Sequence, residues 1–155
     1  MRIALYQPDI AQNTGTILRL AACFGIPADV IGPTGFDMSD RSLKRAALDY
    51  LPFVDLTRHT SFETYLANRM GSSPGRIVLL TTKATLAHTA FSFRPDDTLM
   101  LGRESAGVPD HVHELADARV TIPMRPGLRS LNVAVATAMV LGEALRQTNG
   151  FPDSP

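Results

Sequence analysis

Cysteine and tryptophan are the residue types that this 155-residue chain lacks most clearly, with one cysteine and no tryptophan. Because Cys23 is the single cysteine, an intrachain disulfide framework is excluded and a zinc site is not expected. Chains without disulfides are typical of reducing compartments, so we expect a cytoplasmic protein.

The chain also lacks an excess of charge of either sign and any long hydrophobic run. Lys plus Arg and Asp plus Glu both number 15, so the formal net charge is zero and a nucleic-acid site has to be a local basic patch. The longest largely apolar stretch, 131–141, is far shorter than the roughly 20 residues of a transmembrane helix. Pro8 interrupts the first apolar residues too early for a secretory signal. We therefore expect no membrane association.

Segments typical of strands alternate along the chain with segments typical of helices. The expected strands are 3–6, 28–31, 53–56, 77–80, 99–101 and 120–122. The expected helices are one that opens at 12–15 with Asn13 or Thr14 as its N-cap, then 39–50, 62–66, 112–115 and 130–147. This alternation predicts an α/β fold with a mainly parallel sheet flanked by helices. The length fits a single domain over 1–150, with 151–155 as a loose tail.

Two of the expected strands end in loops marked by glycine or proline. Gly102 and Gly107 follow strand 99–101 and allow positive φ or close approach of a ligand to the backbone. Pro123 and Pro126 follow strand 120–122 and prevent the strand from continuing. Open α/β sheets bind ligands at the carboxyl ends of their strands, so these loops predict one composite pocket.

The expected last helix has no polar stripe between 131 and 141. A helix that is apolar on all sides must be covered on all sides, and a small domain offers little cover. Ala134, Ala138 and Gly142 lie four residues apart and would let a second helix approach closely. We expect a homodimer built on this helix, and the alternative is that the domain buries the helix alone.

Several polar residues in these loops have an ordinary structural interpretation when taken singly. Gly15 and Arg19 fit a helix start followed by a solvated arginine, and Glu104 fits a capping carboxylate. Ser130 and Asn132 fit N-cap residues of the last helix. Only their joint occurrence points to a shared function.

Together these stretches resemble the SPOUT class of RNA methyltransferases. The three motifs of that class correspond to residues 13–19, 101–109 and 122–132, so the resemblance covers most of the chain. Shorter segments are similar to the tRNA (cytidine(34)-2'-O)-methyltransferase branch. They are 5–8, 35–36, 43–46, 48–50, 57–59 and 80–83.

The resemblance implies an α/β-knot fold with a deep trefoil knot in its carboxyl-terminal part, and a homodimer. It also implies transfer of a methyl group from S-adenosylmethionine to the ribose 2'-OH of the wobble nucleotide, cytidine or uridine 34, in the anticodon loop of certain tRNAs, with S-adenosylhomocysteine as product and no metal. The implied cofactor contacts are Leu80, Gly102, Ile122, Met124, Ser130 and Leu131. The implied catalytic and orienting residues are Arg19, Asn13, Glu104, Ser130 and Asn132.

Arg19 is the residue that the resemblance places nearest to the chemistry. An arginine keeps its proton at physiological pH, so we expect it to grip a neighbouring phosphate and stabilise the developing alkoxide, rather than act as a base. Asn13, Glu104 and Asn132 would orient Arg19 and the loops, and Ser130 would lie against the cofactor.

Local basic residues have to replace the missing net charge if RNA is the substrate. Spacings of three and four residues put Arg41, Lys44 and Arg45 on one helix face, although a solvated face without RNA contact explains this pattern equally well. The residues expected to contact RNA are Arg41, Lys44, Arg45, Lys83, Arg103, Arg125 and Arg129.

Two other RNA substrates and one other class of protein remain as alternatives. A SPOUT 2'-O-methyltransferase can act on ribosomal RNA or on another tRNA position, and a non-catalytic RNA-binding assembly factor can keep the same fold. A flavodoxin-like nucleotide module would need a glycine-rich phosphate loop after the first strand, which this sequence lacks. Gly142 and Leu145 stand where the branch has a tyrosine and a tryptophan, so the dimer or the tRNA contacts differ here.

Overall fold

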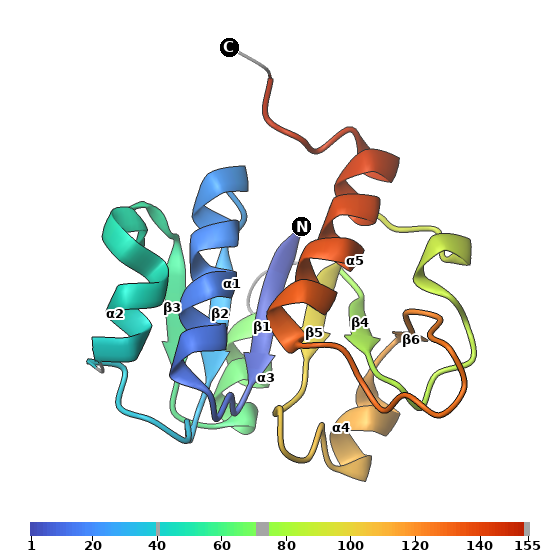
Figure 1. Cartoon of the computed structure of the whole chain (residues 1–155), viewed down its shortest axis with the longest axis horizontal. Coiled ribbons are helices and arrows are strands. Elements are labelled where there is room, and N and C mark those ends of the chain that lie inside the picture. The colour runs from blue at the N-terminus through green and yellow to red at the C-terminus, as the bar shows by residue number, and fades with distance from the viewer. Residues whose placement is uncertain (40, 71–74, 154–155) are drawn as a thin grey trace.

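The computed structural model describes residues 1–39, 41–70 and 75–153, and these form a six-stranded sheet. Every strand pair in the sheet is parallel, and the spatial order is β3-β2-β1-β5-β4-β6 (Figure 1). The strands are β1 (Arg2–Tyr6), β2 (Ala28–Ile31), β3 (Leu56–His59), β4 (Ile77–Leu80), β5 (Thr98–Leu101) and β6 (Ala118–Val120). The predicted α/β fold with a parallel sheet is confirmed.

Helices cover both faces of this sheet. They are α1 (Ala11–Phe24), α2 (Arg41–Ala47), α3 (Phe62–Met70), α4 (Asp110–Leu115) and α5 (Val133–Thr148), with short 3-10 helices η1 (Leu48–Phe53) and η2 (His88–Ala90). Successive strand residues point to opposite faces, so Ile3 packs in the core under α1 and α5, whereas Ala4 packs in a second core with Phe62 of α3 and Val112 of α4.

Helix α1 approaches α2 closely at Gly15. A Cβ atom on Gly15 would lie 2.6 Å from the carbonyl oxygen of Leu43 and 2.7 Å from Cβ of Ala46. Only glycine fits at this crossing, so the glycine of the first motif has a packing role.

The prediction of a strand at 53–56 is wrong, because that strand begins at Leu56 and the residues before it form η1. Leu48 has a positive φ of 51°, Pro52 has no backbone donor, and the side chain of Phe53 is 75% exposed. These residues have the hydrophobic character of a strand, but they lie on the surface. Of the expected helix 39–50, residues 41–47 are α-helical, and Asp40 lies outside the described residues.

The predicted N-caps of α1 are also wrong. Ile10 is the N-cap and gives no side-chain hydrogen bond, so Asn13 and Thr14 lie inside the helix. Asn132 caps α5, because its Oδ1 accepts hydrogen bonds from the backbone N–H groups of Ala134 and Val135. The predicted strand 120–122 is shifted, since β6 ends at Val120 and Thr121 forms only an isolated bridge with Ala87.

Helix α5 has one buried face and one exposed apolar face. Val140 and Leu141 are buried in the core, whereas Val135 and Met139 are 51% and 44% exposed. Ala138 is exposed too, and a Cβ atom on Gly142 would meet no atom within 4 Å. The sheet therefore covers only one side of this helix within the single chain.

None of the helices in the described ranges is long and apolar enough to cross a membrane. Within the same described ranges, no three His, Cys, Asp or Glu residues are placed to hold a metal ion.

Candidate active site

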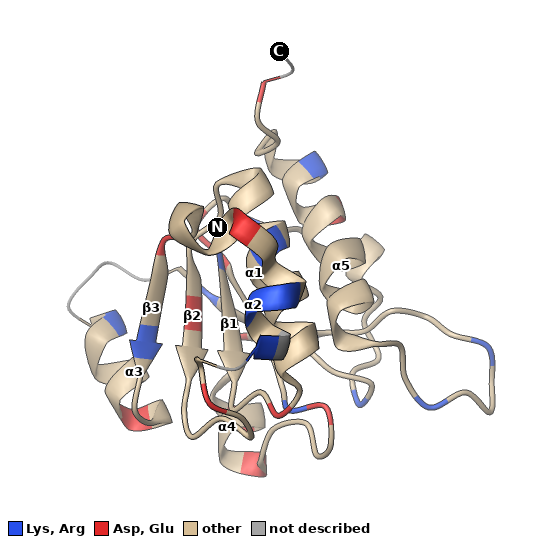
Figure 2. Cartoon of the chain, turned by 60° about the vertical axis from the view of Figure 1, so that its left-hand side comes forward, with Lys and Arg blue, Asp and Glu red and all other residues tan. Residues whose placement is uncertain are grey.

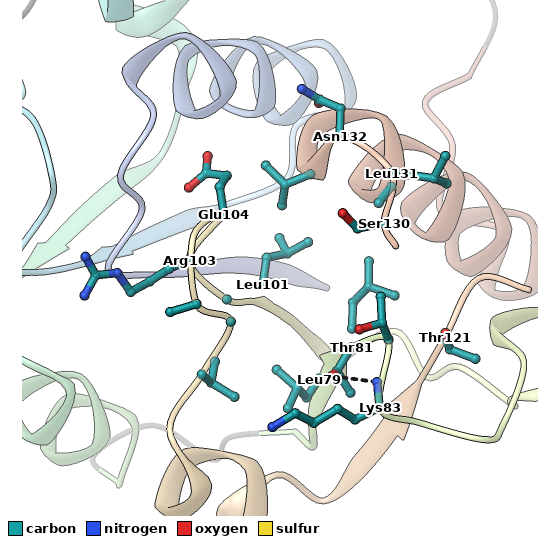
Figure 3. A pocket seen from close by; sticks show the side chains of 18 of the residues that line it. Leu79, Thr81, Lys83, Leu101, Arg103, Glu104, Thr121, Ser130, Leu131 and Asn132 are labelled. Carbon is teal, nitrogen blue, oxygen red and sulfur yellow. Dashed lines mark hydrogen bonds between the residues drawn. The ribbon is translucent and has the colours of Figure 1, made fainter. Parts of the chain in front are cut away.

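A cavity of about 610 Å³ opens at the carboxyl ends of β4 and β5, beside the first turns of α1 and α5 (Figure 3). Most of its lining comes from three chain segments, 79–83, 101–108 and a set of residues between 121 and 136, and Ile10, Asn13 and His113 line it too. The two loops predicted to form a composite pocket therefore both reach this cavity, and the loop after β4 joins them. A cavity of this size is within the range of small-molecule and cofactor sites.

The wall after β5 is made of tightly folded backbone. The N–H group of Arg103 donates to the carbonyl of Gly107 at 3.0 Å, and the N–H group of Gly107 donates back at 2.8 Å. Gly107 has a φ of 69°, and a Cβ atom on Gly102 would lie 2.6 Å from the carbonyl carbon of Gly107. Glycine at 102 thus lets the loop close on itself, which leaves backbone groups at the cavity wall.

A chain of hydrogen bonds connects the three motifs next to the cavity. Nδ2 of Asn132 donates to Oδ1 of Asn13 at 2.9 Å, and Nδ2 of Asn13 donates to Oε1 of Glu104 at 3.0 Å. The other oxygen of Glu104 accepts from the backbone N–H of Asp9 at 3.1 Å. The starts of α1 and α5 and the loop after β5 are therefore held in one arrangement.

The pKa values of Asp9 and Glu104 are shifted in opposite directions. Burial and the neighbouring Asp9 carboxyl raise the pKa of Glu104. Hydrogen bonding to the Glu104 side chain, with a contribution from Ser105, lowers the pKa of Asp9 to about 2. Asp9 also lies 3.6 Å from Nε of Arg103, and this neighbouring positive charge helps to lower the pKa of Asp9.

All six predicted cofactor residues line the cavity. They are Leu80, Gly102, Ile122, Met124, Ser130 and Leu131. Figure 3 shows the apolar side chains of Leu101 and Leu131 on either side of Ser130 in the cavity wall. Such a mixture of apolar surface, backbone groups and few polar side chains fits an adenosyl group, which needs stacking surface and edge hydrogen bonds.

Four of the five predicted catalytic residues line the same cavity, namely Asn13, Glu104, Ser130 and Asn132. Arg19 does not. Its guanidinium lies over the ring of Tyr50 in η1, 5.0 Å from the ring centroid. Since Arg19 follows Asn13 by six residues, it lies about 9 Å farther along α1.

The predicted RNA-binding residues fall into two groups. Lys83, Arg103 and Arg129 line the cavity. Arg41, Lys44, Arg45 and Arg125 do not line it and are exposed on α2 and on the loop between β6 and α5. Figure 2 shows basic residues both on α2 and on that loop, which projects from the body of the protein.

Two residues of the site were missed in the sequence. Asp9 supports Glu104 and Arg103 from the end of β1, and its place shortly after a buried strand was an available signal. His113 of α4 lines the cavity as well, and no signal in the sequence connects it to the two loops predicted to form the pocket.

A parallel sheet with a cavity at its carboxyl edge, walled by interlinked loops, is the arrangement of an α/β protein that binds a small ligand or cofactor there. Comparison with known proteins narrows this class. Residues 1–142 match the SpoU rRNA Methylase family, and the chain belongs to this family.

Curated relatives align over nearly their whole length. The tRNA (cytidine(34)-2'-O)-methyltransferase of Beijerinckia indica is 61% identical over 149 residues, which are 96% of this chain and 92% of that protein. The protein of the same name from Escherichia coli K12 is 41% identical over 154 residues, covering 98% of this chain and 96% of the relative.

Solved structures agree with this fold. One, from work on the 2-OH methylation of C/U34 on tRNA, superposes with a TM-score of 0.90 at 40% identity and covers 96% of both chains. The SpoU methyltransferase AviRb from Streptomyces viridochromogenes, in complex with AdoMet, gives a TM-score of 0.86 at 28% identity, covering 95% of this chain and 60% of that one.

Proposed function

We propose that this protein transfers a methyl group from S-adenosylmethionine to the ribose 2'-OH of nucleotide 34, cytidine or uridine, in the anticodon loop of certain tRNAs. The observation that carries the proposal is the cavity in which six predicted cofactor residues and four predicted catalytic residues meet. The relatives named for this reaction support the choice of substrate. A tRNA substrate also agrees with the expected cytoplasmic location and with a single catalytic domain over 1–150.

In this proposal the cofactor is held mainly by backbone. Gly102 and Gly107 keep the wall after β5 thin, and Leu80, Ile122 and Leu131 supply apolar contact. When bound, S-adenosylmethionine supplies a methyl group on a sulfonium. A ribose oxygen can attack that methyl group, and S-adenosylhomocysteine is the leaving group. The residues of the chain have to align that oxygen and assist the loss of its proton.

Asn13, Glu104 and Asn132 act in the proposal as positioning residues. Their hydrogen bonds fix α1 relative to the cavity, and α1 is the helix that carries Arg19. Arg19 grips the phosphate next to the reacting ribose and stabilises the developing alkoxide. Because Arg19 lies away from the cavity of its own chain, we propose that Arg19 of one subunit acts at the cavity of the partner subunit.

The exposed face of α5 supports the homodimer. Val135, Ala138 and Met139 lie on that face, and Gly142 leaves room for a second helix. Since α1 contacts α5 within the chain, pairing through α5 brings α1 close to the second subunit. Met139→Lys should turn the dimer into a monomer in sedimentation experiments; an unchanged sedimentation coefficient would argue against this interface.

The proposal includes the family's deep trefoil knot in the carboxyl-terminal part, formed when the last helix threads through the loops before it. After β6, at one edge of the sheet, the chain runs back across the carboxyl ends of the strands to α5, which packs against β5 and α1 (Figure 1). An experimental electron-density map of this segment tests whether α5 has passed through a loop.

The basic residues complete the proposal on the RNA side. Lys83 and Arg129 contact phosphates next to the cavity, and Arg125 and the three basic residues of α2 extend the contact. Arg103 already lies close to Asp9 and Gln7, so its contact with RNA needs a rearrangement of that cluster. Phosphate contacts position the tRNA, and the unstacked anticodon base supplies specificity.

The experiment is incubation with labelled S-adenosylmethionine and tRNA from a strain that lacks its own enzyme, followed by mapping of the methylated nucleoside. Label on the ribose of nucleotide 34 supports the proposal. Label at another tRNA position or in ribosomal RNA identifies the alternative enzyme, and cofactor-independent RNA binding without label identifies an assembly factor. Arg19→Ala should abolish transfer and leave cofactor affinity nearly unchanged; equal loss of both contradicts its role.

A further inference from the structure

One ring nitrogen beside the cavity has no hydrogen-bond partner. His113 of α4 lines the cavity, and its Nε2 is closed off from solvent without a partner among the described residues. A buried polar group left in this state costs free energy, and native proteins leave few such groups unsatisfied. A ligand in the cavity is the natural partner for this atom.

Arg119 determines which nitrogen of His113 carries the proton. Nε of Arg119 lies 3.1 Å from Nδ1 of His113, and the same guanidinium donates to the backbone carbonyls of His113 and Glu114. A guanidinium can only donate, so Nδ1 has to accept and the proton lies on Nε2. The unsatisfied atom is therefore a donor, and its partner must be an acceptor.

The charge around this part of the cavity indicates which acceptor. Lys83 also lines the cavity, and Figure 3 shows its side chain at the end of the view where the chain enters α4. An ammonium and an N–H donor at one end favour an anion, whereas Leu101 and Leu131 favour an apolar or aromatic group. S-adenosylmethionine has one anionic group, the carboxylate of its methionyl part.

We propose that Nε2–H of His113 donates a hydrogen bond to the methionyl carboxylate of the bound cofactor, and that Arg119 is the positioning residue that keeps the proton on Nε2. This inference rests on the proposed function, because it assumes that the cofactor occupies this cavity. It adds a binding residue from α4, a helix outside the three motifs that predicted the site.

Calorimetric titration with two ligands tests the assignment. S-adenosylhomocysteine carries the carboxylate, and 5'-methylthioadenosine lacks the whole amino-acid part. His113→Leu should weaken binding of S-adenosylhomocysteine about tenfold or more, as expected for a lost hydrogen bond to a charged group, and leave 5'-methylthioadenosine unaffected. His113→Gln should restore much of the affinity, because the amide nitrogen of glutamine reaches about the position of Nε2.

His111→Leu is the matched control, since His111 is exposed on the same helix. It should change neither affinity, and unfolding midpoints of all variants check that they are folded. Nitrogen-15 NMR of the ring should show the proton on Nε2 in the wild type and a mixture of tautomers in Arg119→Met.

The outcomes separate this inference from the proposed function. Equal weakening of both ligands by His113→Leu, or weakening of neither, overturns the hydrogen bond to the carboxylate while the cofactor site stands. Failure of the wild type to bind S-adenosylhomocysteine overturns the proposed function and this inference together.

Discussion

Two histidines on this fold have the same proton position and opposite surroundings. His59, the last residue of β3, lines a second cavity of about 380 Å³, which we call the amino-end cavity because Arg2 and Thr98, the first residues of β1 and β5, line it too. Nε2 of His59 lies 2.8 Å from Oδ1 of Asp29, and Nδ2 of Asn68 lies 3.3 Å from its Nδ1. His113 lines the larger cavity at the carboxyl ends and has Arg119 on Nδ1, but its Nε2 has no partner in the described structure.

The difference between the two cavities separates a structural cluster from a binding site. Around His59, Asp29 also accepts from Nε of Arg2 at 3.0 Å, so the polar groups satisfy one another. His113, by contrast, lines the larger cavity, and its Nε2 has no partner among the described residues. Paired groups hold the sheet and α3 together, whereas the unpaired group is free to select a ligand.

The largest expected effect is on stability, at the amino-end cavity. Asp29→Ala removes the acceptor of both Arg2 and His59 and leaves them partly buried without a counter-charge. Breaking such a cluster should cost about 3 kcal/mol of unfolding free energy, measured by chemical denaturation. Affinity for S-adenosylhomocysteine should stay the same, and exposed Asp153→Ala serves as control. A loss of affinity in Asp29→Ala would remove the distinction between the cavities.

The second effect is on binding, at the carboxyl-end cavity. Gly102→Ala puts a Cβ atom 2.6 Å from the carbonyl carbon of Gly107, so the loop after β5 has to open. Affinity for S-adenosylhomocysteine should fall about 30-fold, or about 2 kcal/mol, and the unfolding free energy should fall as well because the loop loses its backbone hydrogen bonds. Asp153→Ala, at an exposed position far from the cavity in the sequence, should bind normally. If both variants bind equally well, close folding of this loop is not needed for binding.

The smallest effect concerns Tyr65, which lines the amino-end cavity. Burial raises its pKa to about 12 from 10.0, so the neutral phenol is stabilised in the folded state. The unfolded chain therefore loses this proton first as pH rises. The stability that the neutral phenol contributes is fully present below pH 10.0 and is lost as the pH rises toward about 12. By pH 11 the unfolding free energy has fallen by about 1.4 kcal/mol.

Tyr65→Phe should lack this alkaline loss. Denaturation of both proteins at pH 9, 10 and 11 measures the difference between their curves, since the remaining tyrosines and lysines titrate in both. Parallel curves would show that the hydroxyl is not protected in the folded state.

Sequence periodicity was sufficient to predict the central strands of the sheet, but it misplaced the bounds of the edge strands β3 and β6. Apolar runs such as 77–80 predicted buried strands because a parallel strand is covered on both faces. Residues 53–56 are apolar except for Asp55, and the exposure of Phe53 and the turn at Leu48 further distinguish them from a buried strand. Hydrophobicity alone does not tell a buried strand from an exposed 3-10 helix.

The cavity could be predicted from the positions of glycine and proline after strands, and its residues from the family resemblance. The contact between Asn13 and Asn132 could not, because it depends on how α1 and α5 meet in space. The place of Arg19 over Tyr50 was equally hidden, since η1 was predicted as helix and strand. Local patterns determined the elements, and tertiary packing determined which polar side chains meet.

The hydrogen bond between Asn132 and Asn13 joins residues 119 positions apart. A ribosome releases residue 13 long before residue 132, so a growing chain has the first motif in place with nothing to complete it. Methyl transfer can therefore begin only after α5 has emerged and docked against α1.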